Sequence, residues 1–342
     1  MIGALLVADA HLDLLLELAH RRHRLGERDV FARTWLPLLE AGGVRLQACP
    51  VYVDLDRHPE GTLREALAQV ACLHEAVREN AERVCLVRAG SDLDAVEREE
   101  RLGLVLALEG VEPFGYDLWS AEVFVELGLR LASLTWNRRN PFADGAADEG
   151  GLSRLGRALV DRLVELGVVL DLAHASRRTF DDVLARAAGA PVLVSHAGCR
   201  AVHDHPRNLD DTQLRALADA GGLLCAMLIP IAVDPARPTI ERACEHLEHA
   251  VETMGADRVG VGGDFTRRLA HVLPPTPLPP DGLMPPGMGL DAALDGLAGP
   301  EDYPALEEAL LARGWGAEAV AAVLGGNLLR FLRRALPDGG AA

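Results

Sequence analysis

The sequence contains no lysine: all 34 of its basic residues are arginines, and 51 residues are acidic. The resulting net charge of −17 argues against a nucleic acid or an anionic membrane as a partner, because both are negatively charged themselves. Long hydrophobic runs are also missing, so no segment is predicted to span a membrane. The first candidate site begins at residue 9, and we therefore expect no signal peptide before it.

Closely paired cysteines are missing as well. The six cysteines form no CxxC pattern, and most lie in apolar runs, as buried free thiols do: Cys49, Cys72, Cys85, Cys199, Cys225 and Cys244. This pattern predicts a reducing, cytoplasmic location. The sequence also lacks GxSxG, GxGxxG and P-loop motifs, which argues against a serine hydrolase and gives no sign of a nucleotide site.

The sequence does contain an alternation of short apolar runs and helical segments along its 342 residues, 49% of which are hydrophobic. Eight of the runs are predicted strands: residues 4–9, 44–53, 104–108, 131–135, 168–172, 191–195, 222–227 and 258–262. The helical segments between them include residues 12–20, 32–42, 60–82, 118–128, 151–166, 210–220 and 239–255, and a helix capped by Ser176. Short, wholly apolar strands flanked by helices are typical of a parallel sheet buried on both faces.

Eight strand–helix units predict an α/β fold of the (β/α)8 TIM-barrel type, as one domain over residues 1–336 with a disordered tail at 337–342. A doubly wound open sheet is the alternative. The barrel is favoured because polar residues follow five of the strands, and in a barrel the carboxyl ends of all strands converge on one mouth.

Three further segments have predictions of their own. Residues 84–88 form an extra short strand, and residues 291–335 are helical, with Gly325-Gly326-Asn327 dividing the last two helices. The proline-rich segment 271–289 is either a surface connector or a lid over the barrel mouth, since it follows the last strand.

Six polar residues lie at the ends of the predicted strands: His11, Asp13, Glu109, His174, His196 and Asp264. Bringing these carboxylates and imidazoles together without a cation would bury like charges with no compensation. One or two divalent metal ions remove that conflict. We therefore predict a metal site at the carboxyl ends of the strands.

The ligand count fits two ions. His11 and Asp13, two residues apart, suit one ion. His174 and His196 suit the other, and Glu109 has the two oxygens needed to bridge the pair. Three nitrogen ligands among five favour zinc over magnesium or calcium. A carboxylated lysine, which bridges the metals of many barrel hydrolases, is excluded here, so the bridge has to be the glutamate.

Two further residues have candidate roles beside the metals. Asp264 remains as a proton acceptor and donor next to a hydroxide that bridges the ions. Arg207, in the turn Pro206-Arg207-Asn208, either holds a substrate carboxylate through a bidentate pair or is an exposed loop residue. His203 and His205 in the same segment are interpreted as loop histidines rather than ligands.

Eight segments, in this order, resemble motifs of the membrane dipeptidase (renal dipeptidase) family of zinc metallopeptidases, within the amidohydrolase-type barrels. They are DAHLD at 9–13, LALEGVE at 106–112, LTWNRRNPFADG at 134–145, DLAHAS at 171–176, PVLVSHAGCRAV at 191–202, HPRNLDD at 205–211, VGVGGDF at 259–265 and GGNLLRFL at 325–332. The resemblance is specific because the whole set occurs in order along nearly the entire chain.

The resemblance implies a zinc-dependent dipeptidase with two ions, in some members with tolerance for a D-residue at the C-terminal position of the substrate. It implies the same five metal ligands, with a catalytic role for Asp264 and a substrate-carboxylate role for Arg207. Trp136 stands where the family has a substrate-contacting histidine, and Thr266-Arg267 stands where the family has Asp-Gly. Both departures predict a changed substrate preference.

Two other functions stay open. A metal-dependent amidase or lactamase on another small carboxylate-bearing amide would fit the changes at Trp136 and Thr266-Arg267. A metal-retaining protein that only binds a ligand or partner would fit the loss of the family histidine. A homodimer is compatible with the resemblance and is supported by nothing else in the sequence.

Overall fold

The computed structural model describes residues 5–55, 58, 60–273, 283–285 and 287–338. All eight predicted strands are present and pair in parallel. Their bounds are β1 (Val7–Asp9), β2 (Val44–Tyr52), β4 (Leu102–Glu109), β5 (Leu129–Ser133), β6 (Val169–Asp171), β7 (Val192–Ala197), β8 (Leu223–Met227) and β9 (Val259–Gly262).

The eight strands close into a barrel. Their order is β2-β1-β9-β8-β7-β6-β5-β4, and a further pairing of β2 with β4 joins the two ends. The predicted (β/α)8 barrel is therefore confirmed, and the open sheet is wrong. The predicted extra strand is β3 (Val84–Leu86), which pairs with the first residues of β4.

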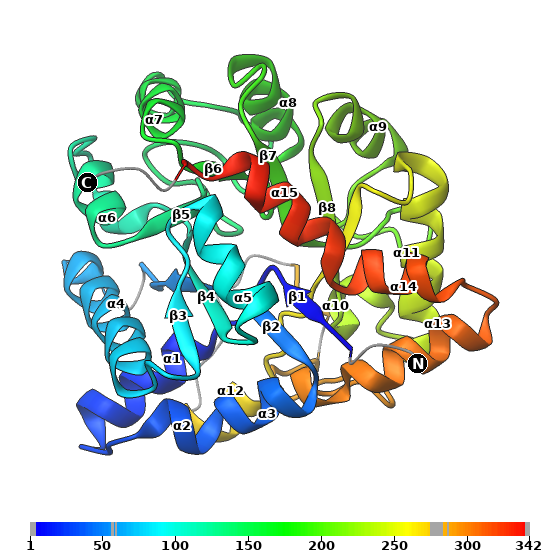
Figure 1. Cartoon of the computed structure of the whole chain (residues 1–342). Coiled ribbons are helices and arrows are strands. Elements are labelled where there is room, and N and C mark those ends of the chain that lie inside the picture. The colour runs from blue at the N-terminus through cyan, green and yellow to red at the C-terminus, as the bar shows by residue number, and fades with distance from the viewer. Residues whose placement is uncertain (1–4, 56–57, 59, 274–282, 286, 339–342) are drawn as a thin grey trace.

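Helices surround the barrel (Figure 1). Those that follow strands of the ring are α4 (Thr62–Glu79), α6 (Ser120–Glu126), α7 (Arg154–Glu165), α8 (Arg177–Arg186), α9 (Asp211–Asp219) and α11 (Ile240–Met254). Shorter helices are α1 (Leu14–Ala19), α2 (Val30–Thr34), α3 (Leu36–Ala41), α5 (Leu93–Arg98), α10 (Pro230–Val233) and α12 (Arg267–Val272). Ser176 caps α8 as predicted, because its Oγ accepts a hydrogen bond from the backbone N–H of Thr179.

The hydrophobic core has two layers because strand side chains alternate in direction. Inside the barrel lie small and branched side chains such as Ala8, Leu46 and Leu193. Between the strands and the helices lies the larger cluster, which includes Leu104 and Phe180. All six cysteines are free and buried, as predicted.

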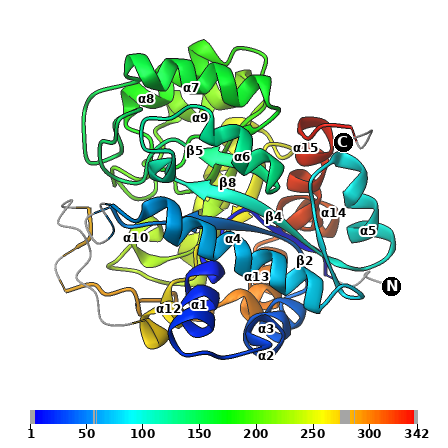
Figure 2. The same ribbon diagram turned by 90° about the vertical axis from the view of Figure 1, so that its left-hand side faces the viewer.

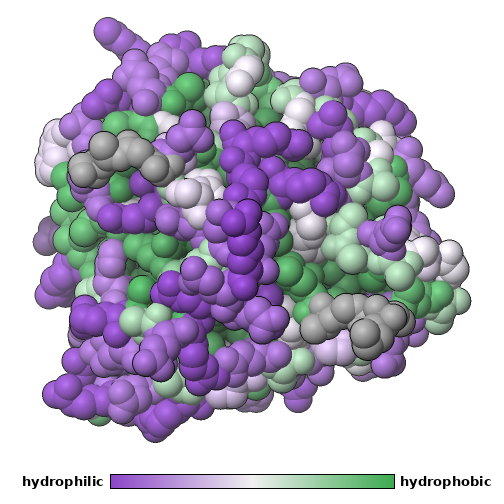
Figure 3. Space-filling model, viewed as in Figure 1, coloured by the Kyte–Doolittle hydropathy of each residue, from purple (hydrophilic) through white to green (hydrophobic). Residues whose placement is uncertain are grey.

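The C-terminal helices close the end of the barrel opposite the mouth. These are α14 (Ala317–Ala321) and α15 (Asn327–Ala335), and α15 sends Leu328 and Phe331 into the core inside the barrel. The helix before them, α13 (Tyr303–Ala312), packs against α11 in the outer layer. In Figure 2, α14 and α15 lie on the right, whereas α1, α10 and α12 lie on the left, at the mouth. Figure 3 shows the closed end, where hydrophilic residues gather over the region of α15.

The prediction for the C-terminal segment is wrong in two details. Residues 291–299 are not helical, and helical structure begins at Pro300. Gly325 and Gly326 do not divide two helices, because a π-helical turn (Ala322–Gly326) joins α14 to α15. A side chain at Gly325 would lie 2.4 Å from the carbonyl oxygen of Leu6, so this glycine serves a close approach to β1 rather than a helix stop.

Two predicted segments fall partly outside the described residues. Residues 274–282 and 286 belong to the proline-rich segment, so the choice between a connector and a lid stays a prediction. Of the predicted tail, 339–342 lie outside as well, whereas the carbonyl of Pro337 accepts a hydrogen bond from the backbone of Gly90. Within the part of the chain that is described, no helix has the length and apolar character needed to cross a membrane.

The burial of His246 on α11 leads to a prediction of how the stability of the protein depends on pH. Its Nδ1 accepts a hydrogen bond from the backbone of Cys199 (2.9 Å), and its Nε2–H donates to the carbonyl of Val233 (2.8 Å), so the neutral ring is satisfied. Burial lowers the pKa of His246 from 6.5 to about 4. Between these values the unfolded chain binds a proton that the folded chain does not, so the free energy of unfolding falls as pH falls from 6.5 to 4.

The contribution of His246 to this fall is expected to be about 3 kcal/mol, at about 1.4 kcal/mol per pKa unit. Urea unfolding of the wild type and of His246→Gln between pH 4 and pH 7 measures it, and the variant should show the flatter dependence. His271→Gln, at an exposed site, is the control and should keep the wild-type slope. An unchanged slope in His246→Gln would contradict the assignment.

Candidate metal centre at the barrel mouth

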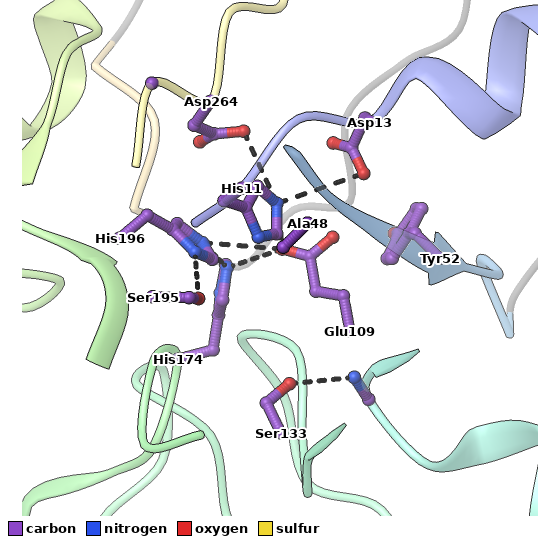
Figure 4. A network of polar contacts seen from close by, with 12 residues as sticks. His11, Asp13, Ala48, Tyr52, Glu109, Ser133, His174, Ser195, His196 and Asp264 are labelled. Carbon is purple, nitrogen blue, oxygen red and sulfur yellow. Dashed lines mark hydrogen bonds and ion pairs between the residues drawn. The ribbon is translucent and has the colours of Figure 1, made fainter. Parts of the chain in front are cut away.

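The candidate site lies at the mouth of the barrel, where five strands end (Figure 4). The structure brings all six predicted residues together there: His11 and Asp13 after β1, Glu109 at the end of β4, His174 after β6, His196 in β7 and Asp264 after β9. All are buried except Asp13, which is half-buried. The convergence follows from the parallel barrel, which directs the carboxyl end of every strand to the same mouth.

Glu109 lies at the centre of the cluster. Its Oε1 is 2.8 Å from Nε2 of His174 and 3.5 Å from Nε2 of His196. The same oxygen is 3.6 Å from Nε2 of His11. Strand register sets Glu109 opposite Ser133, whose Oγ accepts a hydrogen bond from the backbone N–H of the next residue, Gly110. One carboxylate oxygen, fixed at a strand end, therefore faces three imidazole nitrogens.

Hydrogen bonds behind two of the imidazoles orient the rings. Nδ1 of His174 is 2.6 Å from Oδ1 of Asn137, so Nδ1–H donates to this oxygen. Nδ1 of His196 is 2.8 Å from Oγ of Ser195. The Ser195 hydroxyl can accept the Nδ1 proton of His196. With a proton on each Nδ1, each Nε2 has a lone pair, and the two Nε2 atoms lie 2.8 Å apart. Lone pairs this close repel each other, and a cation bound beside them would remove the repulsion.

His11 faces a second pair of carboxylates. Its Nε2 is 3.9 Å from Oδ1 of Asp13 and 3.7 Å from Oδ1 of Asp264. Among the described residues, neither Nε2 of His11 nor Oδ1 of Asp13 has a hydrogen-bond partner, although both atoms are buried. Buried polar atoms without partners are costly, and a divalent cation would satisfy both. The donor atoms form two overlapping groups, each within 4.8 Å: His11, Glu109 and His196, and His11, Asp13 and Asp264.

The environment shifts the pKa values at the site toward the neutral forms. Burial lowers the pKa of His11 to about 3 and raises that of Asp13 to about 7. Burial, followed by the nearby Asp13 carboxylate, raises the pKa values of Glu109 and Asp264 well above their usual range. Neutral imidazole is the metal-binding form of histidine, and buried carboxyl groups become charged readily only beside a cation. The donor set thus fits a divalent metal ion.

Asp9 holds the ends of two strands together. Its Oδ1 accepts hydrogen bonds from the backbone N–H groups of His11 (3.0 Å) and Gly263 (2.9 Å), and its Oδ2 accepts one from the hydroxyl of Tyr303 (2.8 Å). The backbone N–H of Asp264 in turn donates to the carbonyl of His11 (3.0 Å). Asp9 was not predicted to have a role, although it lies at the end of the first predicted strand, where polar residues gather.

Asp171 does the same for the neighbouring strands. Its Oδ1 accepts hydrogen bonds from the backbone N–H groups of Ala173 and Ser195, both at 2.9 Å. The turn that follows places His174 in the left-handed region, with φ of 63°. Asp171 and Asn137 were also missed as positioning residues, although both lie inside segments that matched family motifs.

Arg207 lies inside the site rather than on the surface. Only 4% of its area is exposed, and its Nη2 donates to the carbonyl of His196 at 3.4 Å. The alternative of an exposed loop arginine is therefore wrong. The loop is drawn inward because the Asn208 side chain accepts a hydrogen bond from Gly198 and donates one to the carbonyl of Ala232, both at 2.8 Å.

Trp136 lies beside the cluster, half-buried. The centroid of its ring is 5.8 Å from that of His174 and 5.3 Å from that of Tyr52. Strand register places Tyr52 opposite Glu109, and Figure 4 shows the phenol ring on the far side of Glu109 from the histidines. The side of the mouth formed by these strands is therefore aromatic.

The sequence model of the membrane dipeptidase family (peptidase family M19) matches residues 2–272 of this chain. The chain belongs to this family. Dipeptidase verJ from Clonostachys rogersoniana is 30% identical over 275 residues, which cover 79% of this chain and 65% of that relative. The chain thus spans less than two thirds of the length of this relative.

Solved structures of similar proteins have the same barrel. Dipeptidase AC, a metallopeptidase of family M19, is 25% identical with a TM-score of 0.83, over 98% of this chain and 99% of that one. A metallopeptidase from Rhodobacter sphaeroides, liganded with a phosphinate mimic of the dipeptide L-Ala-D-Ala, is 24% identical with a TM-score of 0.83. The match covers 97% of this chain and all of that one. Both likenesses extend beyond the family match to the C-terminal helices.

Proposed function

We propose that this protein is a metal-dependent dipeptidase that binds two zinc ions at the barrel mouth. The observation that carries the proposal is the convergence of three imidazole Nε2 atoms on one oxygen of Glu109, all within 3.6 Å. Membership of the membrane dipeptidase family supports the reaction. Three nitrogen donors among five support zinc as the metal.

The residues divide between two ions as their geometry suggests. His11 and Asp13 would hold one ion, and both have a buried donor atom without a hydrogen-bond partner among the described residues. His174 and His196 would hold the other, since their Nε2 lone pairs lie together, and Glu109 would contact both ions. Bound ions of this kind polarise a peptide carbonyl and make water a stronger nucleophile at neutral pH.

Two residues would handle the rest of the reaction. Asp264 would accept a proton at Oδ1 from the attacking water and pass it to the amine of the leaving residue. Arg207 would hold the C-terminal carboxylate of the substrate, because a buried guanidinium offers two parallel N–H donors to a carboxylate. The dipeptide mimic bound by the R. sphaeroides metallopeptidase supports a dipeptide as the substrate.

A second candidate function is hydrolysis of another small amide that carries a carboxylate, as in an amidase or lactamase. Trp136 favours it, because an indole has no nitrogen lone pair to accept a hydrogen bond and cannot carry the positive charge of an imidazolium. The same carboxylate holder and proton carrier would serve this reaction. The difference between the two functions lies in the substrate that fits beside the aromatic side of the mouth.

A panel of L-L and L-D dipeptides, offered to protein of known zinc content, tests the proposal. Removal of the metal by a chelator is expected to lower hydrolysis at least ~100-fold, and added zinc is expected to restore it. Cleavage that persists in metal-free protein would refute the metal role. Two bound ions with no cleavage of any dipeptide would favour another amide or a binding role instead.

A further inference from the structure

A small apolar cluster lies at the mouth of the barrel, apart from the two larger cores. Its members are Met227, Ile229, Ile231, Ala232, Met284 and Met288, and we call it the methionine cluster. Four of them come from the end of β8 and from α10, and two come from the segment that precedes residue 289. Figure 2 shows α10 on the mouth side of the barrel.

The alternation of side chains along β8 directs Met227, the first residue of the methionine cluster, toward the site. Leu223 and Cys225 of β8 belong to the core inside the barrel, whereas Leu224 and Ala226 belong to the outer layer. Met227 is the next inward position and therefore faces the barrel axis at the mouth. Its register partner on β9 is Gly262, two residues before Asp264.

Hydrogen bonds join the segment of the methionine cluster to the neighbours of both residues proposed to contact the substrate. On the Asp264 side, the backbone N–H of Leu228 donates to the carbonyl of Gly263 at 3.3 Å. On the Arg207 side, the Asn208 side chain donates to the carbonyl of Ala232 at 2.8 Å. The segment that carries the cluster is therefore bonded to the residue before the proton carrier and to the residue after the carboxylate holder.

The other flank of Arg207 is tied to the cluster as well. Nδ1 of His205 accepts a hydrogen bond from the backbone N–H of Arg207 (3.2 Å), so Nε2 carries the proton. This Nε2–H donates to the carbonyl of Leu283 at 2.9 Å, next to Met284. The rings of His203 and His205 stack on each other, with centroids 5.8 Å apart.

We propose that the methionine cluster binds the side chain of the C-terminal residue of the substrate and selects an apolar one. This inference rests on the proposed dipeptidase function. The α-carbon of that residue carries both the carboxylate and the side chain, so a carboxylate held by Arg207 brings the side chain next to the cluster. A charged side chain would be buried there among six residues that have no charged or hydrogen-bonding side-chain group.

The methionines also explain how side chains of different shape could fit. Met227 is 4% exposed, and Met284 and Met288 are half-buried, so little open space stands ready. Methionine is unbranched and flexible, and its side chain moves to fill irregular gaps. The cluster should therefore accept leucine, methionine or phenylalanine and reject aspartate and lysine.

Hydrolysis of Ala-Gly, Ala-Ala, Ala-Leu, Ala-Met, Ala-Asp and the reversed dipeptide Leu-Ala by zinc-loaded protein tests the inference. The kcat/KM for Ala-Leu and Ala-Met is expected to exceed that for Ala-Gly by at least ~10-fold, because each buried carbon adds to binding. Ala-Asp is expected to be the poorest substrate. The selectivity should follow the C-terminal residue, so Leu-Ala should gain little over Ala-Ala.

Variants of the methionine cluster should lower this selectivity. In Met227→Ala and Met284→Ala, the ratio of kcat/KM for Ala-Leu to that for Ala-Gly is expected to fall several-fold. Met254→Ala removes a buried methionine from α11, away from the mouth, and should leave the ratio unchanged. The loss in the first two variants with retention in the third would support the inference.

The outcomes separate this inference from the function on which it rests. Cleavage of the whole panel at similar rates, or selectivity that follows the N-terminal residue, would overturn the role of the methionine cluster and leave the dipeptidase function intact. Failure to cleave any dipeptide with two ions bound would overturn both. A ratio that falls equally in Met254→Ala would show a general effect on packing and would also overturn the role of the cluster.

Discussion

Replacement of Glu109 by alanine is expected to reduce the zinc content from two ions per chain to at most one, and to lower kcat/KM for dipeptide hydrolysis at least ~100-fold. The reason is geometric. One oxygen of Glu109 faces the nitrogens of His11, His174 and His196, so its loss removes a ligand that both proposed ions share. Of the five proposed ligands, His11 and Asp13 would remain for one ion, and His174 and His196 for the other.

A loss of folding would give the same loss of activity, and the stability of the metal-free protein separates the two. Burial raises the pKa of Glu109, so at neutral pH this carboxyl group lowers the stability of the folded protein without metal. We therefore expect Glu109→Ala to unfold without metal at the same temperature as the wild type or at a higher one, and to gain less when zinc is added. Metal content by mass spectrometry and melting curves with and without zinc measure both effects.

Glu112 offers a matched control for Glu109. It lies three residues later in the same segment, and burial raises its pKa to about 7 as well. Its Oε1 accepts a hydrogen bond from the side chain of Asn140 at 3.0 Å, and it belongs to neither metal group. Glu112→Gln should therefore keep two ions per chain. Two ions in Glu109→Ala, or loss of ions in Glu112→Gln, would contradict the proposed bridge.

The ends of the strands could be predicted from the sequence because the information there is local. An apolar run followed by Glu109 or His174 indicates both a strand and a polar residue at the end of that strand. Once eight such runs are recognised, the barrel brings the ends together without any knowledge of individual contacts. This explains why the fold and the set of converging residues were both accessible.

Residues that act through distant contacts were not accessible in this way. Asp9 gains its role from Gly263 and Tyr303, and 294 positions separate it from that tyrosine. Gly325 looks like a helix stop in the sequence, and only the closeness of β1 shows why a side chain is excluded there. The sequence around Arg207 does not indicate that this residue is buried. Its loop is held inside the site by the hydrogen bond from the Asn208 side chain to the carbonyl of Ala232. Each of these depends on how the closed barrel juxtaposes segments.

The replacement of Asp264 by asparagine is expected to lower kcat by ~100-fold to 10,000-fold while both zinc ions remain bound. An amide cannot accept the proton that the carboxylate would take from water, so the chemical step suffers more than substrate binding. KM should accordingly change only a few-fold. Steady-state kinetics and metal analysis on the same preparation test both parts of this expectation.

Asparagine is the right substitution because of the backbone at this position. Asp264 has φ of 53°, a left-handed conformation that asparagine adopts far more readily than most other residues. The backbone N–H of residue 264 can therefore keep its hydrogen bond to the carbonyl of His11. Asp264→Ala would add backbone strain to the loss of the carboxylate, and its larger effect could not be assigned to proton transfer.

Metal content decides between two roles for Asp264. Its Oδ1 lies 3.7 Å from Nε2 of His11 and forms a group with Asp13 that could hold an ion, so a ligand role is as compatible with the distances as a proton carrier. If Asp264 is a metal ligand, its replacement should also remove an ion. If it only carries a proton, its replacement should leave both ions bound. Loss of one ion in Asp264→Asn would therefore move Asp264 into the ligand set and require another group to carry the proton.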